Sequence, residues 1–147
     1  QYLYLGDFND PLKTRQAAES LIANGVDVIL SSVNLGNYGL YNAVKEADSP
    51  VFITTKYSDK KVHAPDNYLT SDIFDFTVPI NAIVGKVLGG EKGGFTLLEY
   101  GKGKARRAQF PISNVSQEIS DRIEQIFADV GAGKISIVKN LATINIK

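Results

Sequence analysis

The feature that most constrains the fold is a strand–turn–helix–strand unit within the first 30 residues. Residues 3–5 are predicted to form a strand, and Asp10 followed by Pro11 is a strong helix start. There the carboxylate accepts free N–H groups, and proline needs no donor at that position. An apolar stripe follows at helical spacing, and Gly25 stands where a helix end favours a left-handed residue. A second strand over 26–30 completes a βαβ unit, which predicts a parallel sheet.

Strands and helices continue to alternate along the rest of the chain. The expected helices cover 40–47, 75–88 and 114–130, and the second of these is expected to be the longest. Asn114 with Gln117 three residues later makes a capping-box start for the last helix. The expected further strands cover 51–55, 68–70, 95–100, 107–112 and 135–138, with one more candidate at 143–146. This alternation predicts a single α/β domain over residues 1–147, with a doubly wound, mostly parallel sheet.

Composition excludes several classes of function. Sixteen basic and sixteen acidic side chains cancel, so no overall field draws the chain to nucleic acid or to anionic lipid. The absence of cysteine removes disulfides and thiolate chemistry. No apolar run approaches the roughly 20 residues that a membrane span requires. We therefore expect a globular domain whose partners do not include nucleic acid.

The residues that could carry catalysis do not form a recognisable set. His63 is the only histidine and lies in a polar loop, where a solvated side chain is the simpler interpretation. One histidine without cysteine provides no metal-ligand cluster, and Asp10, near Asp7, is better explained as a helix cap. The glycines of 89–94 follow a helix and precede a strand, which is the reverse of a phosphate-binding loop. The basic run 102–107 is typical of a solvated hairpin tip. We expect no enzyme, no metal and no cofactor.

The candidate ligand contacts are residues that follow the predicted strands. Phe8 and Asn9 follow the first strand, Asn34 and Gly36 the second, and Lys56 the third. Open α/β sheets bind ligands beyond the carboxyl ends of their strands, so these residues are expected at one edge. The Phe8 ring either stacks on a planar ligand or packs against the helix that follows. The loop after the second strand either offers N–H groups to a polar or anionic ligand or simply caps its helix.

The opening motif resembles that of the basic membrane lipoproteins, the substrate-binding proteins of bacterial nucleoside-type ABC transporters. Their second lobe opens with a strand, a Gly-x-Phe-(Asn/Ser)-Asp-Pro-x-Lys turn and a helix that leads to Gly-x-Asp-Val-Ile. Residues 6–13 and 25–29 have this pattern here. Weaker likeness continues through Ala-Val-Lys-Glu-Ala at 43–47, Leu-Thr-Ser at 69–71 and Phe-Thr-Leu-Leu at 95–98.

The resemblance implies one lobe of a type I periplasmic-binding-protein-like fold. It further implies a lobe that acts outside the cytoplasm, as a membrane-associated lipoprotein at the cell surface or in the periplasm, and that serves an ABC permease. The implied ligand is a nucleoside or another small polar molecule, with base stacking by Phe8. The implied partner is the missing first lobe of the same protein or, failing that, a second copy. Residues 107–147 are then the return segment that packs on that lobe. We accordingly expect the chain to be a piece of a longer protein.

Several positions depart from the family pattern. The ribose-binding aspartate of nucleoside-binding members corresponds to Lys56, and their ligand-contacting lysine corresponds to Phe74. Glycines that follow the second strand are replaced by Asn34 and Leu35. An ammonium group cannot accept hydrogen bonds from a ribose diol, so Lys56 suits an anionic ligand better.

A degenerate receiver-like signalling domain is the competing hypothesis. Residues 27–39 resemble the strand and loop around the phosphorylated aspartate of response regulators, but Ser32 stands at the acceptor position. Only one helix separates the first two strands, where a receiver needs an additional helix and strand. A sensor domain built on the same receptor fold is a further alternative, because fold does not determine function.

Overall fold

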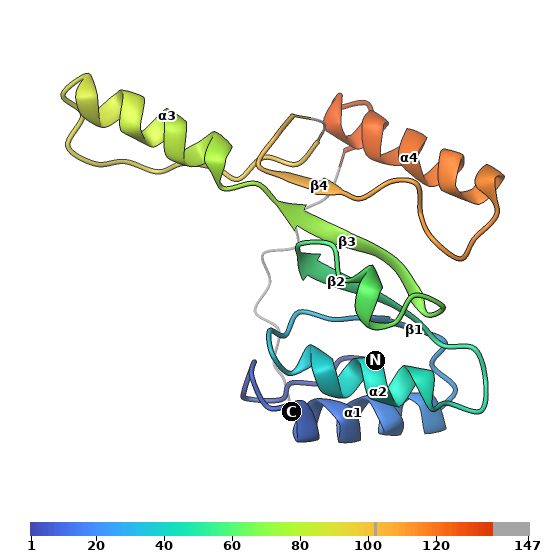
Figure 1. The fold of residues 1–147 in the computed structure, drawn as a ribbon. Coiled ribbons are helices and arrows are strands. Elements are labelled where there is room, and N and C mark those ends of the chain that lie inside the picture. The colour runs from blue at the N-terminus through green and yellow to red at the C-terminus, as the bar shows by residue number, and fades with distance from the viewer. Residues whose placement is uncertain (102, 137–147) are drawn as a thin grey trace.

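The computed structural model describes residues 1–101 and 103–136 (Figure 1). Its elements, in chain order, are α1 (Pro11–Ala23), β1 (Val28–Leu30), α2 (Asn37–Lys45), β2 (Phe52–Tyr57), the 3-10 turn η1 (Lys61–His63), β3 (Tyr68–Phe74), α3 (Thr77–Leu88), β4 (Arg106–Ala108) and α4 (Gln117–Gly131). Within the described residues the strands form one sheet in the order β1-β2-β3-β4. The first three strands are parallel and β4 is antiparallel to β3. The expected mostly parallel α/β sheet is confirmed.

The start and end of α1 are those that the sequence predicts. Asp10 is the N-cap, and its side chain accepts a hydrogen bond from the Lys13 N–H at 3.0 Å, with Pro11 as the first helical residue. After the helix, Gly25 has φ 79°, and its N–H donates to Ile22 O at 2.9 Å. Both ends are determined by residues within the segment itself.

The main core lies between α1, α2 and one face of β1 and β2 (Figure 1). Ile29 and Ile53 are register partners in neighbouring strands and are both buried, beneath Leu40 and Val44 of α2. Val28 and Leu30 of β1 are exposed, so residues 1–101 and 103–136 leave this end of the sheet uncovered on its other face. Pleating explains the pattern, because successive side chains of a strand point to opposite faces.

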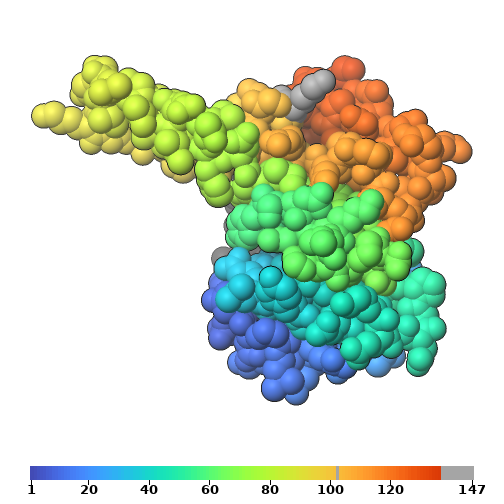
Figure 2. Space-filling model, viewed as in Figure 1, coloured from blue at the N-terminus to red at the C-terminus, as the bar shows by residue number. Residues whose placement is uncertain are grey.

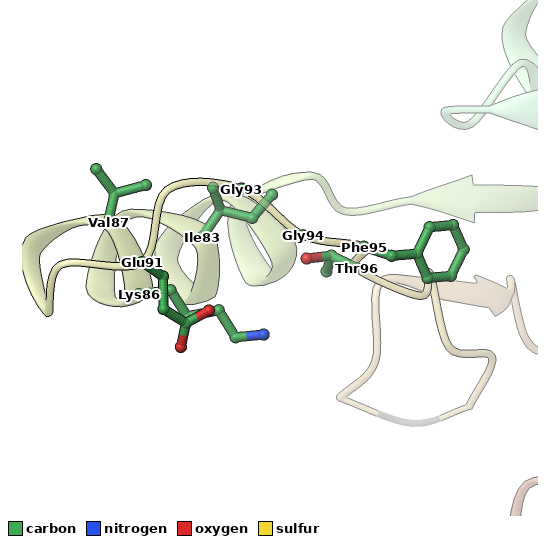
Figure 3. A pocket seen from close by; sticks show the side chains of 8 residues that line it. All are labelled: Ile83, Lys86, Val87, Glu91, Gly93, Gly94, Phe95 and Thr96. Atoms are coloured by element: carbon green, nitrogen blue, oxygen red, sulfur yellow. The ribbon is translucent and has the colours of Figure 1, made fainter.

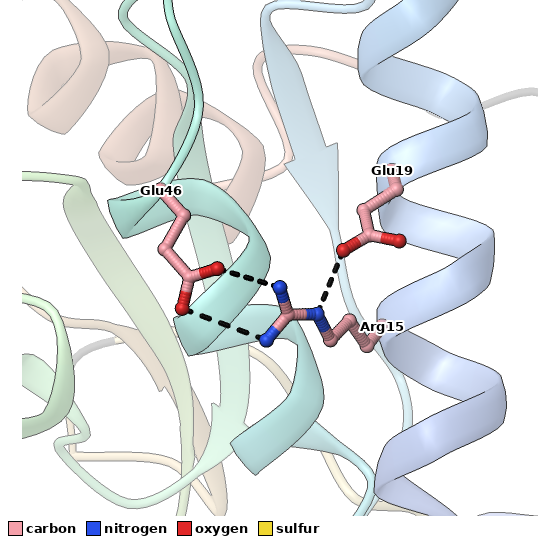
Figure 4. Close-up of polar contacts among 3 residues, drawn as sticks. All are labelled: Arg15, Glu19 and Glu46. Carbon is pink, nitrogen blue, oxygen red and sulfur yellow. Dashed lines mark hydrogen bonds and ion pairs between the residues drawn. The ribbon is translucent and has the colours of Figure 1, made fainter.

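An arginine on α1 links the outer surfaces of the two helices (Figure 4). Arg15 donates from Nε to Glu19 Oε1 at 2.7 Å and from Nη2 to Glu46 Oε2 at 2.5 Å. All three side chains are open to solvent, where such pairs contribute little stability. The close packing of α1 on α2 therefore depends on the residues between the helices.

Two predicted strands are absent from the described structure. Residues 3–5 have no regular structure, and Tyr2 and Tyr4 are largely exposed. A strand forms only where its backbone pairs with a neighbouring strand, and in the described sheet residues 3–5 make no such pairing with β1. Residues 95–100 form only an isolated bridge, between Tyr100 and Arg106. The edge of β3 that they could have joined is occupied by β4 instead.

Helix α4 begins later than the capping box predicts. Ser116 is its N-cap and accepts from the Ile119 N–H at 3.3 Å. Asn114 has φ 58°, and its Nδ2 donates to Pro65 O and Tyr68 O, both at 2.8 Å, so its side chain serves a tertiary contact. Helix α3 is shorter than α1 and α4, so the expectation that it is the longest helix is wrong. The candidate strand at 143–146 and half of that at 135–138 lie outside the described residues.

Residues 76–98, which we call the α3 arm, extend away from the rest of the described molecule (Figures 1 and 2). Every residue from 80 to 95 is exposed, including Leu88 at 83% and Phe95 at 84%. Helices that are apolar on all sides are normally buried. None of the described helices has the length and apolar character that crossing a membrane requires.

The segment after the arm packs on β3. Buried Ser120 of α4 accepts a hydrogen bond from the Ile112 N–H at 2.9 Å. The Phe127 ring lies 5.4 Å from that of Tyr100 and 5.7 Å from that of Phe110. Ile119 and Ile126 on α4 remain exposed. The apolar stripe of α4 is therefore only partly covered by the described residues.

Candidate ligand-binding site

A shallow hollow of about 170 Å³ lies beyond the carboxyl ends of β1 and β2. Its walls come from the loop after β1, the first turns of α2, the end of β2 and the turn η1. The lining residues are Val33, Asn34, Leu35, Asn37, Tyr38, Tyr41, Lys56, Tyr57, Lys60 and His63. The hollow therefore occupies the edge at which open α/β sheets bind their ligands.

The loop after β1 is held by a buried polar pair. Ser31 Oγ donates to Asn37 Oδ1 at 2.6 Å, and Asn37 Nδ2 donates to Val33 O at 2.8 Å. Ser31 and Asn37 are both buried. Asn37 is thus the first residue of α2, and its side chain holds the loop through these two hydrogen bonds. Gly36 occupies the N-cap position.

The turn that contains Phe8 is joined to this loop through the backbone. Phe8 O accepts from the Asn34 N–H at 2.8 Å and from the Gly36 N–H at 3.1 Å. A Cβ on Gly36 would lie 3.2 Å from Phe8 O and 2.5 Å from Thr14 Oγ1 of α1, so glycine suits this close approach of the segments. The N–H groups of Asn34 and Gly36 are consequently hydrogen-bonded within the protein.

The five predicted contacts occupy different places around the hollow. Asn34 and Lys56 line it, whereas Phe8, Asn9 and Gly36 do not. The Phe8 side chain is 62% exposed, so little of its ring is covered by the following helix. The Asn9 N–H donates to Asp7 Oδ1 at 2.8 Å in a short polar turn, and Asn9 itself is exposed.

An aromatic wall on one side of the hollow was not expected from the sequence. The His63 ring stacks on Tyr41 with centroids 5.0 Å apart and planes 10° apart, and Tyr38 meets both rings edge-on. His63 is half-buried, so the expectation of a solvated loop histidine is wrong. Burial raises the pKa of Tyr41 to about 12. The three-residue spacing of Tyr38 and Tyr41 was the available signal, because it puts both on one helix face.

The part of the lining from the end of β2 and the segment after it is basic and contains a strained residue. Tyr57 has φ 78°, a conformation that non-glycine residues adopt mainly where a site requires it. Lys56 lies in register with Asp72 on β3, and that carboxylate pairs with Arg106. None of the ion pairs within residues 1–101 and 103–136 uses the ammonium group of Lys56 or Lys60.

A second hollow, of about 310 Å³, runs along the α3 arm (Figure 3). Ile83, Lys86 and Val87 of α3 face the returning segment that holds Glu91 and Phe95. It lies away from the strand ends, between exposed parts of one projecting segment. Among the described residues, no group of three or more His, Asp or Glu side chains is placed to hold a metal ion.

The parallel strands, and a hollow built from the loops that follow them, are typical of α/β ligand-binding lobes. This chain belongs to the Bmp family of PnrA-like ABC transporter substrate-binding proteins, whose model matches residues 1–102. The family that the opening motif resembles is thereby confirmed. No match was found among curated proteins.

Two solved structures share the fold. A solute-binding protein of an ABC transporter system from Aeropyrum pernix K1 superposes with a TM-score of 0.73 at 18% identity, over 95% of this chain and 48% of that one. An ABC transporter solute-binding protein from Conexibacter woesei DSM 14684 gives 0.65 at 18% identity, over 94% of this chain and 46% of that one. This chain therefore spans about half the length of the solved structures that it matches.

Proposed function

We propose that this chain is the ligand-binding lobe of an extracytoplasmic solute-binding protein that delivers a small polar ligand, nucleoside-like or other, to an ABC permease. The observation that carries the proposal is the hollow at the carboxyl edge of the sheet, in a chain of the substrate-binding Bmp family. The role is binding without catalysis. In the cell, the protein acts as a membrane-associated lipoprotein at the cell surface or in the periplasm.

The proposed contacts have distinct roles. Asn34, from the loop after β1, and Lys56, from the end of β2, both line the hollow with polar side chains. The exposed ring of Phe8 is available for stacking on a planar ligand, and the neighbouring amide of Asn9 offers a donor and an acceptor. Gly36 acts through its backbone, which holds the Phe8 turn against the binding loop.

We further propose that the α3 arm contacts the other half of the receptor. Receptors of this kind bind ligand between two lobes that close by a hinge motion. The arm is apolar on several sides and exposed along its length, and the chain spans about half of the matching solved structures. That residues 107–147 also pack on the other lobe stays a prediction.

Native mass spectrometry of the chain, after equilibration with a concentrated small-molecule extract of cells, tests the ligand site. We expect a small-molecule adduct on the wild type and its loss in Tyr38→Ala, which removes part of the aromatic wall. Tyr2→Ala is the matched control, because Tyr2 is exposed and outside the hollow. An adduct that survives Tyr38→Ala, or one that is lost equally in Tyr2→Ala, would contradict the proposal.

The same spectra test the partner of the arm. A monomer is expected, because the other half of the receptor is the proposed partner. A stable dimer that is lost in Ile83→Glu but kept in Lys86→Glu would identify a second copy as the partner instead. Both side chains belong to α3 and face the hollow along the arm (Figure 3), so the pair separates apolar contact from charge.

A further inference from the structure

We infer that the ligand of the hollow beyond β1 and β2 is a compact planar anion, such as an aromatic carboxylate. This inference rests on the proposed function, since it names the ligand class of the same site. It depends on which charges and which rings line the hollow.

The charged side chains that line the hollow are basic. Lys56 and Lys60 supply two ammonium groups, and none of the described lining residues is an aspartate or a glutamate. The nearest carboxylates along the chain and across the sheet have other partners. Asp72 pairs with Arg106, and Asp59 accepts from the Lys61 N–H at 2.8 Å and from Gln109 Nε2 at 2.6 Å. The donors to Asp59 are neutral, so its carboxylate keeps its charge, but Asp59 does not line the hollow. A ligand with a negative charge would therefore meet two ammonium groups and no carboxylate among the lining residues.

The rings at the hollow favour a planar ligand. His63 and Tyr41 form a stacked pair with Tyr38 edge-on to it, and Tyr57, in its strained conformation, also lines the hollow. Aromatic faces pack well against other ring systems. The volume of about 170 Å³ is below the 300–1,000 Å³ that is typical of sites for drug-sized ligands, which favours one or two rings.

The ammonium groups of Lys56 and Lys60, and not the backbone N–H groups at the start of α2, must attract the negative charge of the ligand. The N–H groups of Asn37, Tyr38 and Gly39 already donate to carbonyl oxygens three residues earlier, at 2.9–3.1 Å. The N–H groups of Asn34 and Gly36 donate to Phe8 O. Because these backbone donors are used, substitution of the lysines should remove most of the preference for an anion.

Calorimetric titration with orotate and with uracil tests this directly, because the two rings differ mainly by one carboxylate. We expect orotate to bind at least tenfold more tightly at low ionic strength, about 1.4 kcal/mol. The ratio should fall as salt is added, since exposed charges are screened. Lys56→Met and Lys60→Met should each reduce it several-fold, while Lys61→Met, next to Lys60 but outside the hollow, should leave it unchanged.

Several results would overturn the inference. Equal or tighter binding of uracil would do so, as would a preference for orotate that persists in both Lys56→Met and Lys60→Met. If both probes bind equally and Tyr38→Ala abolishes both, the proposed function stands and only the charge of the ligand is wrong. Binding of neither probe, nor of the second pair benzoate and benzamide, also overturns it. The adduct in the native spectra then decides separately on the proposed function.

Discussion

Helix α2 carries one wall of the hollow, and a single glycine allows it to lie against α1. A Cβ on Gly39 would stand 1.8 Å from Pro11 O and 2.9 Å from Arg15 N, well inside ordinary van der Waals contact at 3.4 Å and above. Both neighbouring atoms belong to the α1 backbone, so no side chain can rotate out of the way. Gly39→Ala must therefore push the two helices apart.

The size of the effect follows from two opposing terms. Alanine is favoured over glycine inside a helix by about 0.8–1.0 kcal/mol. Overpacking costs about 1–3 kcal/mol and occasionally more, and a clash of backbone with backbone belongs at the upper end. We expect Gly39→Ala to lower the free energy of unfolding by about 2 kcal/mol. For a chain of this size, that shifts Tm by roughly 4–8 °C.

Gly85→Ala is the matched control, because Gly85 is also helical but no atom lies within 4 Å of its added Cβ. Here only the propensity term acts, and stability should rise by up to about 1 kcal/mol. Urea unfolding followed by circular dichroism measures both variants. If Gly39→Ala were as stable as Gly85→Ala, the close contact of α1 with α2 would be wrong.

Three further predictions concern the anchoring of α4, the pH response and the stacking ring. Ser120→Ala leaves the buried Ile112 N–H without its acceptor, and urea unfolding should show a loss of about 1–3 kcal/mol. The hydrogen bond from the Lys61 N–H holds the pKa of Asp59 below its usual range. Its stabilisation is complete above the unfolded-state pKa of about 3.9 and is lost as pH falls through the lower folded-state value, so Asp59→Asn should flatten acid unfolding there. Phe8→Ala should weaken ligand binding in the two-lobed protein with Tm nearly unchanged, and the reverse result would assign the ring to packing.

Sequence reasoning succeeded where the deciding contacts are local. The cap at Asp10 and the left-handed turn at Gly25 each involve groups within four residues, so both could be predicted. Asn114 shows the limit of such reasoning. Its position suits a helix cap, but its Nδ2 donates to backbone carbonyl oxygens 46 and 49 residues away. Ser116 caps the helix instead.

The site divides in the same way. Asn34 and Lys56 follow parallel strands, which bring such residues to one edge, and both line the hollow there. That either residue contacts a ligand stays a prediction. The stack of His63 on Tyr41 joins η1 to α2, and no local pattern signals that contact. The strand expected at 3–5 also depended on a non-local contact, because a strand forms only where its backbone pairs with a neighbouring strand.

The central claim is that ligand binds at the carboxyl edge of the sheet and not along the α3 arm. Its most direct test is an amide ¹H–¹⁵N shift map of the chain titrated with the small molecule released from the native complex. Shift changes that gather on residues 33–38 and 56–63 are predicted. Changes that gather on residues 83–96 would contradict the account and assign the site to the hollow of the arm.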